Sequence, residues 1–382
     1  MNMKKLVYNV CLVCLLALVC NCSNDELPTE DFKYVVTFGE SYDTLSWSDM
    51  VDSVQYIPLK TPDGAMMGDI KQLVVAFNHM YAITQNGVYC FDMDGNTVFK
   101  VNRGRAHYEY LNANSISVSD RLLYLFDNYK QRILALDAIN GEYCGEMRVP
   151  IGGATAYCLA DRILFENFET DSIGRYRLFL KGNDQHIEKG FVKSKEHAEG
   201  KWTNDGLLYS SHIRNLAWKI DGIDCIPYLK VVVPSEKALP DDIVSDLIES
   251  GQLPHQVQFD THGVIYYLRY LNECRDFITG MLLSGNSYDY FIHDKKTGNS
   301  WVFNSSSLKS LKVWEKLPLS EVSAGYINCV FTVINPMYAN FGDDGSKPAD
   351  PRLMDAYNVI HSSQKDDNPI IGRFWLKSIQ DK

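Results

Sequence analysis

Two stretches of the chain repeat one pattern, and this repeat decides what kind of fold the chain forms. The first reads VYCFDMDGN at positions 88–96 and the second reads ILALDAING at positions 133–141, so their final glycines lie 46 residues apart. In each stretch a strand-like run ends in an aspartate and leads into Asp-Gly or Asn-Gly, dipeptides that supply the positive φ angles of tight hairpins. The repeat therefore predicts the same β-hairpin in two successive units of the chain.

Short runs rich in β-branched and aromatic residues surround both hairpins, and turn residues bound each run. These runs lie at 72–77, 80–84, 87–92 and 97–101, and then at 115–118, 122–126, 132–137 and 143–149. Runs of four to seven residues have the length of strands and are too short for most helices. Similar sets follow at 154–192, 207–233 and 259–303. A period of about 40–50 residues built from four strands is typical of a β-propeller blade.

The two ends of the folded region supply a sixth blade. The remaining strand-like runs lie at 326–334 and 370–377, and the run at 53–60 can join them from the other end of the chain. A blade shared between both ends closes the ring and removes the exposed edges of an open sheet. We therefore predict an all-β fold, a six-bladed β-propeller with four-stranded blades over residues 53–382. Helical spacing of apolar residues at 241–250 and 348–363 predicts two short helices on its rim, with a lid as the alternative role.

The first residues of the chain have the make-up of a secretory signal. Lys4 and Lys5 precede an apolar run that extends to Cys20, which is short for a membrane span of roughly 20 residues, although an uncleaved anchor is the alternative. Because this run ends in cysteine, residues 1–21 are predicted to be a lipoprotein signal peptide. Cys22 is the expected lipidation site, because Val19 lies three residues before it and a polar, acidic segment follows it. Cys20 is the alternative, since neither Asn21 nor Val19 is the small residue usual before such a cysteine.

A polar, acidic segment follows Cys22 and is expected to be a tether over residues 22–52. A thioether lipid together with an N-terminal acyl chain provides the two anchors that stable membrane attachment requires. A flexible tether of this kind has an r.m.s. reach of roughly 5–6 Å times the square root of its length. The acidic start of the tether resembles the export signal of surface lipoproteins in some Gram-negative bacteria. We expect an outer-membrane lipoprotein, either periplasmic or surface-exposed.

Composition and charge exclude several classes of partner. Loss of Lys4 and Lys5 with the signal takes the net charge from −11 to −13, so phosphate backbones and anionic lipid faces are repelled and nucleic acid is not an expected partner. The membrane link is therefore the lipid. Six cysteines remain in the mature domain without any C-x-x-C spacing, which argues against a zinc cluster or redox pair and for small buried side chains. They are Cys90, Cys144, Cys158, Cys225, Cys274 and Cys329.

The order of these features resembles a family of six-bladed β-propeller lipoproteins from gut-dwelling Gram-negative bacteria, with the architecture of NHL- and TolB-like propellers. The resemblance rests on the lipobox-like cysteine, the opening strand at 52–61, the hairpin at 91–95 and the segment 366–371 before the last strand. It frames almost the whole mature chain, and its ends are the more specific part. It implies the fold and no activity, because the family is defined by its fold.

One loop departs from that family's pattern. Members carry a glycine- and proline-rich turn that ends in Gly-Glu-Tyr between the first two blades, whereas this chain keeps Glu109-Tyr110 but places bulkier residues before it. The loop is a candidate ligand-binding face, and a bulky blade connector is the alternative. The candidate residues are Arg103, Arg105, His107, Glu109 and Tyr110.

Other motifs do not identify a chemistry. Asp92-x-Asp94 lacks the sixth-position glycine and twelfth-position glutamate of an EF-hand and is interpreted as a hairpin turn. The S-x-x-K spacing at 306–309 has no companion motifs, and His255 and His262 could meet only through the fold. No metal or cofactor is expected. The favoured function is binding or scaffolding of an unknown protein, peptide or glycan; an enzyme is less favoured, and would be a hydrolase or lyase acting on a carbohydrate or lactone at the central channel.

Lipidation can be tested directly. Radiolabelled palmitate should enter the wild-type protein and be absent from Cys22→Ala, because the modified sulfur is then missing. Label that is lost only in Cys20→Ala would move the site to Cys20, and label that survives both substitutions would refute the lipid anchor.

Overall fold

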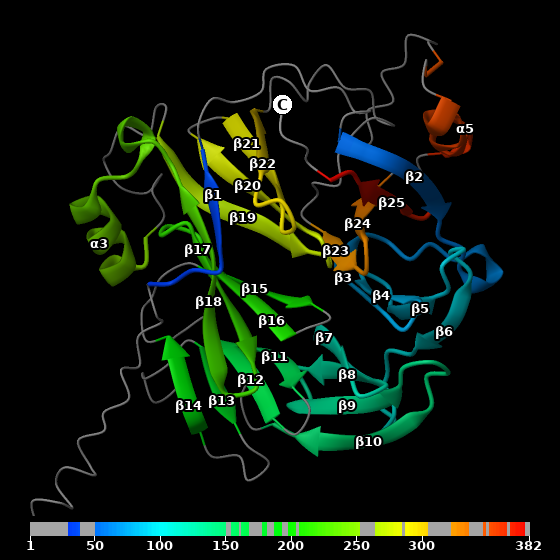
Figure 1. Ribbon diagram of the computed structural model, residues 1–382. Coiled ribbons are helices and arrows are strands. Elements are labelled where there is room, and N and C mark those ends of the chain that lie inside the picture. The colour runs from blue at the N-terminus through cyan, green and yellow to red at the C-terminus, as the bar shows by residue number, and fades with distance from the viewer. Residues whose placement is uncertain are drawn as a thin grey trace, which may run out of the picture.

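The structure of the chain is a computed structural model in which six sheets surround one axis (Figure 1). The residues that it describes are 30–38, 50–149, 154–159, 162–167, 178–181, 187–192, 198–203, 206–252, 264–284, 287–304, 322–335, 347–348, 351–364 and 367–378. Five sheets have four strands and the sixth has five. The predicted six-bladed β-propeller is thereby confirmed.

In blades 1, 2 and 3 the strands follow chain order outward from the axis. Blade 1 contains β3 (Ile70–Ala76), β4 (His79–Thr84), β5 (Val88–Phe91) and β6 (Thr97–Val101). Blade 2 contains β7 (Ala113–Ser119), β8 (Leu122–Asp127), β9 (Arg132–Asp137) and β10 (Tyr143–Arg148). Blade 3 contains β11 (Ala154–Leu159), β12 (Arg162–Asn167), β13 (Leu178–Lys181) and β14 (Ile187–Val192).

Blades 4 and 6 both take a strand from the N-terminal part of the chain. Blade 4 contains β15 (Ala198–Thr203), β16 (Gly206–Ser211), β17 (Leu216–Asp221) and β18 (Asp224–Val232), with β1 (Tyr34–Thr37) outside them. Blade 5 contains β19 (Ile265–Glu273), β20 (Phe277–Ser284), β21 (Ser287–Asp294) and β22 (Ser300–Asn304). Blade 6 contains β23 (Ser323–Tyr326), β24 (Cys329–Ile334), β25 (Ile370–Leu376) and, outermost, β2 (Val51–Pro58).

The shared sixth blade closes the ring as predicted. β2 pairs antiparallel with β25 from Val51 opposite Leu376 to Pro58 opposite Ile370. Both predicted helices are present: α3 (Asp241–Ser250), which ends at Gly251 in the left-handed conformation, and α5 (Met354–Ser362). Short 3-10 turns lie at η1 (Pro62–Gly64), η2 (Ser235–Lys237) and η5 (Pro351–Leu353). No helix in the described part of the chain is long and apolar enough to cross a membrane.

The repeated aspartate shapes the hairpins that revealed the fold. The Asp92 carboxylate accepts hydrogen bonds from the backbone N–H groups of Asp94 and Asn96. Asp137 accepts equivalent bonds from Ile139 and Asn140, so both blades use the same side chain to hold the turn. These hydrogen bonds lower the pKa of Asp92, although its partial burial acts in the opposite direction. The interpretation of this motif as a hairpin turn therefore agrees with the structure.

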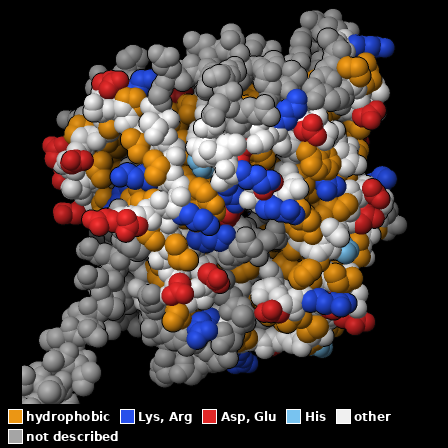
Figure 2. Space-filling view, in the orientation of Figure 1, with side chains coloured by type: hydrophobic (Ala, Val, Ile, Leu, Met, Phe, Trp, Pro, Cys, Tyr) orange, Lys and Arg blue, Asp and Glu red, His pale blue; other side chains and the backbone are white. Residues whose placement is uncertain are grey.

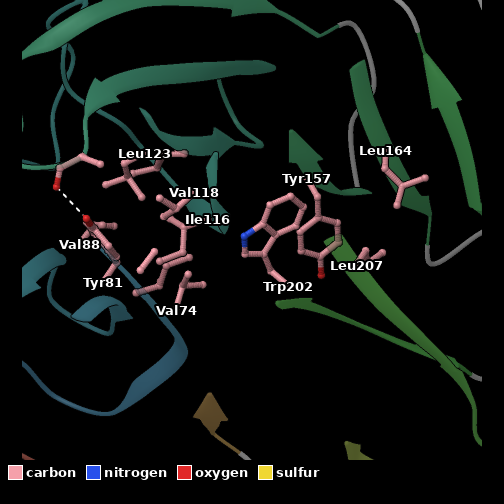
Figure 3. Close-up of a cluster of buried hydrophobic side chains, with 14 of the residues drawn as sticks. Val74, Tyr81, Val88, Ile116, Val118, Leu123, Tyr157, Leu164, Trp202 and Leu207 are labelled. Carbon is pink, nitrogen blue, oxygen red and sulfur yellow. Dashed lines mark hydrogen bonds between the residues drawn. The ribbon is translucent and has the colours of Figure 1, made fainter. Parts of the chain in front are cut away.

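Apolar side chains between neighbouring blades form the core. One buried cluster runs through blades 1 to 4 and includes Tyr81, Leu123, Leu164 and Trp202 (Figure 3). The Tyr81 hydroxyl donates to the carbonyl of Ala138 at 2.8 Å, which links blade 1 to blade 2. Of the six cysteines, all free, four are buried as expected, but Cys225 is half-buried and Cys144 is exposed.

Polar side chains on the innermost strands also join neighbouring blades. The amide of Gln72 donates to the carbonyl of Ile116 at 3.0 Å and accepts from the N–H of that residue at 2.8 Å. Ser115 makes the same two-way contact with the backbone of Ala156, at 2.7 and 3.1 Å. Buried polar groups need hydrogen-bond partners, and these side chains find theirs on the neighbouring blade. They therefore stabilise the ring, and they place polar residues in the innermost strands.

The folded region begins earlier than the sequence indicated. β1 pairs parallel with β18, with Tyr34 opposite Leu229, inside the segment expected to be an irregular tether. Val36 is fully buried, and Phe38 packs edge-on against Phe291 at 6.2 Å. The expected tether through residue 52 is therefore interrupted by a strand, and β2 begins at Val51. A four-residue strand within a polar, acidic segment is too short to show a strand pattern.

β1 should therefore contribute to stability. In the soluble domain, residues 30–382, Phe38→Ala is expected to lower the free energy of unfolding by about 3–5 kcal/mol, because it opens a cavity between blades 4 and 5. Val35→Ala is the matched control, since Val35 is exposed on β1, the strand that directly precedes Phe38, and it should change stability by less than about 0.5 kcal/mol. Denaturant unfolding measures both. Equal, small losses would show that β1 is dispensable.

Candidate functional site

A cavity of about 900 Å³ opens at one end of the ring, and we call it the mouth. It lies where the innermost strands of the blades end and turn back into the second strands. All six blades contribute side chains to its wall. One example from each of blades 1 to 6, in order, is given by Phe77, Asp120, Arg162, Trp202, Glu273 and Ile327. The volume falls within the roughly 300–1,000 Å³ of ligand pockets. In the view of Figure 2, Lys and Arg side chains gather around the centre of the molecule.

A buried ionic cluster forms one wall of the mouth. The Glu273 carboxylate, at the end of β19, lies 2.8 Å from Lys295 Nζ and 3.2 Å from Lys219 Nζ, and it accepts a hydrogen bond from the Tyr228 hydroxyl. Burial alone would raise the pKa of Glu273, but the two ammonium groups hold it below its usual range. Glu273 is therefore ionised and fully engaged, which suits a structural carboxylate better than a proton donor.

Hairpin turns form the rim of the mouth on the side of blades 5, 6 and 1. Phe77 and Ile327 each occupy the first position of a two-residue turn, and their side chains are 44% and 45% exposed. Tyr326 is half-buried between them, and its hydroxyl accepts from the N–H of Asn78 at 3.1 Å. The N–H of Arg275 donates to the carbonyl of Ile327 at 2.6 Å. The turns of three blades are thus joined into one continuous surface, which we call the rim arc.

A narrower channel of about 200 Å³ adjoins the mouth along the axis, and Trp202 lines both cavities. The Trp202 ring stacks on Tyr157 with centroids 6.2 Å apart and planes 7° apart, and Figure 3 shows this pair, which joins blade 4 to blade 3. Most of the remaining channel wall is polar and includes Gln72, Asn114, Thr155, Glu199, Lys201 and Ser323. The arrangement places an indole ring at the junction between a wide opening and a narrow polar channel.

Lys201 and Glu199, both on β15, are the titratable pair of the channel. Lys201 Nζ donates to Ser323 Oγ at 3.3 Å, across the channel from blade 4 to blade 6. Burial lowers the pKa of the Lys201 ammonium to about 8, although the Glu199 carboxylate opposes this shift. His212 Nε2 lies 3.8 Å from a carboxylate oxygen of Glu199. An amine with this pKa carries a sizeable neutral fraction near neutral pH and can act as a base or nucleophile.

β19, the innermost strand of blade 5 and a neighbour of β15, is irregular. Tyr270 has a φ of 54°, and the register of β19 against β20 shifts between Arg269 and Asn272. Such a bulge re-aims side chains, and bulges are over-represented beside functional sites. The Arg269 guanidinium lies over the Tyr270 ring at 4.7 Å, and its charge helps to lower the pKa of Glu199 against the effect of burial.

Within the described residues there is no place where three or more histidine, cysteine, aspartate or glutamate side chains could hold a metal ion. The channel wall itself contains an amine, Lys201, and a carboxylate, Glu199. The His212 imidazole contacts Glu199 but does not line the channel.

The predicted ligand-binding loop lies elsewhere. It connects β6 to β7, at the end of β7 opposite the mouth, and none of its five candidate residues lines either cavity. Tyr110 is buried in the core, while Arg103, Arg105 and His107 are exposed and Glu109 is half-buried.

Backbone carbonyls fix this loop to blade 2. Lys130 Nζ donates to the carbonyls of Gly104, Ala106 and Glu109 at 3.0, 3.1 and 2.8 Å. Arg103 Nε donates to the carbonyl of Leu111 at 2.9 Å. These contacts suit a blade connector, and a ligand role for the loop stays a prediction. Cys20, Cys22, His255, His262 and the S-x-x-K stretch lie outside the described residues.

Sequence reasoning missed the strand that carries most of the channel chemistry. β15 reads AEGKWT, with a glutamate, a glycine and a lysine where a buried strand would have apolar residues. The fourth blade was expected to begin at residue 207, one strand too late. The signal that could have found β15 is its spacing in the sequence, because two residues separate it from β16, as two residues separate the first and second strands of blades 1 and 2.

Fold and site together define the class of this protein as a six-bladed β-propeller with a polar central channel and a wide mouth. The profile of one family, described as a domain of unknown function (DUF4934), matches residues 33–374. The chain therefore belongs to the DUF4934 family. The match begins at the residue before β1, so it covers the strand that joins blade 4. No curated protein matches the chain.

One solved structure supports the fold, and two others match with TM-scores below 0.5. A protein of Bacteroides fragilis described as exported is 14% identical and covers 90% of this chain and 100% of its own, with a TM-score of 0.72. A protein of unknown function from Bacteroides caccae is 8% identical and covers 62% and 81% of the two chains, with a TM-score of 0.38. The Neurospora crassa Pan2 WD40 domain is 10% identical and covers 76% and 80%, also with a TM-score of 0.38.

The pKa of Lys201 can be measured by NMR after reductive methylation with ¹³C-formaldehyde. The Lys201 resonance, identified by its absence in Lys201→Met, should titrate near pH 8, whereas exposed lysines titrate near about 10.4. Glu199→Gln should move the midpoint lower still, because it removes the negative charge that favours the ammonium. A midpoint near 10 would mean that the channel does not desolvate this amine.

Proposed function

We propose that this protein is a lipid-anchored binding propeller of the cell envelope and that it binds its ligand in the mouth. The observation that carries the proposal is a cavity of about 900 Å³ to which every blade contributes. Such a site exists only in the closed ring, and its volume suits an oligosaccharide or a short peptide. The structural neighbour described as exported is consistent with an envelope protein.

The chemistry of the mouth favours binding over catalysis. Its buried carboxylate, Glu273, is neutralised by Lys219 and Lys295 and cannot readily give or take a proton. Exposed side chains of mixed character surround it, including Phe77 and Arg275. A site that fixes a ligand needs this mixture of apolar contact and a few placed charges, without a poised acid or base.

The direction of β1 bears on how the mouth would be presented. β1 runs parallel to β18, and β18 begins just after the Asp221-Gly222 turn that lines the mouth. The chain before β1 therefore approaches the propeller from the mouth side. With lipid on Cys22, eleven residues would separate the anchor from β1, with an r.m.s. reach of roughly 17–20 Å. The mouth would then be held toward the envelope and close to it.

Filling the mouth tests the proposal without assuming a class of ligand. A panel of glycans and peptides should yield at least one ligand for the soluble domain, residues 30–382, measured with and without divalent ions. Ser119→Trp places an indole in the mouth and should weaken binding at least tenfold. Val98→Trp, which adds the same ring to an exposed position on the outermost strand of blade 1, should leave binding within twofold.

Circular dichroism and the melting temperature of both variants show whether they fold. Equal binding by the two folded variants, or no ligand in the whole panel, would refute the mouth as a binding site.

A second function has one observation in its favour, the Lys201 and Glu199 pair in the channel. An amine with a pKa of about 8 beside a carboxylate could act in a hydrolase or lyase on a carbohydrate or lactone. Incubation of the wild type with the same panel would then yield product, and Lys201→Met would yield none. Binding without product formation supports the non-catalytic function.

A further inference from the structure

Two residues on the rim arc occupy a backbone conformation that their side chains disfavour. Phe77 and Ile327 both have a φ of 50°, in the left-handed region. Glycine, asparagine and aspartate adopt this region readily, whereas a β-branched or bulky residue there is an outlier. Both side chains are nearly half exposed, so burial in the core does not explain them. Strained residues of this kind cluster at ligand sites, where the fold maintains them for their contacts.

The arc that carries them is rigid. Tyr326 Oη donates to Asn78 Oδ1 at 3.1 Å as well as accepting from the Asn78 backbone, so blades 6 and 1 are joined by two hydrogen bonds. Blades 6 and 5 touch backbone to backbone beneath the arc, since a Cβ on Gly325 would lie 1.6 Å from the carbonyl oxygen of Glu273. The apolar side chains are therefore held in place before any ligand arrives, which lowers the entropy cost of binding.

A cation stands at one end of this apolar surface. Arg275 is exposed beside Ile327, and within the described residues its guanidinium forms no ion pair. The nearby ammonium groups are engaged, Lys295 with Glu273 and Lys296 with Asp276 at 2.8 Å. Arginine presents two parallel N–H donors to a carboxylate. The rim arc thus presents apolar side chains for contact with a ligand and, beside them, the Arg275 guanidinium for binding a carboxylate.

We propose that the rim arc binds an oligosaccharide that carries carboxylates, a uronic-acid glycan, with sugar faces against Phe77 and Tyr326 and a carboxylate on Arg275. Sugar rings present flat C–H faces to aromatic rings, which suits these side chains. Peptide capture by strand addition needs unpaired backbone edges, but the turns here use theirs on each other: the N–H of Asn78 and the carbonyl of Ile327 are both hydrogen-bonded. This inference rests on the proposed function of the mouth and names its ligand class.

Calorimetry on the soluble domain, residues 30–382, tests the ligand class. The probes are trisaccharides of galacturonate, glucuronate and mannuronate, each paired with its carboxyl-reduced form, and acidic hexapeptides. At least one uronate should bind, with its reduced form at least tenfold weaker. Arg275→Gln should abolish most of that difference by weakening the uronate alone. Equal binding of reduced and acidic sugars, binding of the peptides only, or no binding of any uronate would overturn the proposal.

Substitution of the strained residues separates a ligand role from a structural one. Phe77→Asn and Ile327→Asn should raise the melting temperature by roughly 1–3 °C, because asparagine tolerates the left-handed conformation, and should weaken uronate binding at least fivefold. Val98→Thr, which removes another exposed apolar side chain away from the mouth, should change neither quantity. Unchanged affinity in both asparagine variants would overturn the rim arc as the contact surface.

The outcomes distinguish this inference from the proposed function. If a neutral glycan or a peptide binds and Ser119→Trp blocks it, the mouth remains the binding site and only the uronate assignment fails. If no ligand responds to Ser119→Trp, the proposed function of the mouth fails as well.

Discussion

The pairing of β2 with β25 is the interaction on which the remainder of the molecule depends. It joins residues from the two ends of the fold, with Ile57 opposite Ile371 and Tyr56 packed edge-on against Phe374 at 6.0 Å. The chain then continues into blade 1, where the N–H of Lys60 donates to the carbonyl of Gly95 at 2.8 Å. Gly95 is required there, because a Cβ would lie 2.4 Å from the carbonyl oxygen of Pro58. Closure thus connects blade 6 to blade 1, so that the ring has no gap between its first and last blades.

A closed ring separates stability from function in space. The buried apolar clusters lie between blades, where side chains such as Tyr81, Phe165 and Phe331 pack away from the axis. The axis itself can then contain charged groups such as Lys201 and Glu199, because the energy that maintains the fold is gained elsewhere. The rim arc likewise depends on stability gained elsewhere in the ring. Its turns can hold Phe77 and Ile327 in a disfavoured conformation because the blades on either side fix both ends of each turn.

The same separation explains what the sequence could and could not predict. Strands whose side chains pack between neighbouring blades are apolar or alternate apolar and polar residues, and several lead into Asp-Gly or Asn-Gly turns. Five blades and the ring closure were therefore predictable from runs such as 88–96. The innermost strands of blades 1 and 2 keep enough apolar residues to be recognised, although they carry Gln72 and Ser115. β15 faces the polar channel with Glu199 and Lys201 and was missed for this reason. β23 was missed as well, since the predicted run at 326–334 shares only its last residue.

The candidate site could not be predicted for two reasons. Its strands contain polar residues, and its residues are far apart along the chain. Phe77, Glu273 and Ile327 lie roughly 50 to 250 residues apart and meet only when the ring closes. No local motif marks them. The loop at 102–110 was predicted as a candidate because its bulky residues depart from the pattern of the family that the sequence resembles. Contacts of Lys130 with its backbone hold it at the opposite end of blade 2 from the mouth.

Hydrogen exchange of the soluble domain, residues 30–382, with and without the best ligand of the binding panel tests the central claim most directly. If the mouth is the binding site, bound ligand should slow exchange in the three hairpins at 76–79, 273–276 and 326–329, which belong to different blades. The connector at 102–110 should exchange as before. Slowed exchange at 102–110, with the three hairpins unchanged, would contradict the account and locate the ligand at the other end of the propeller.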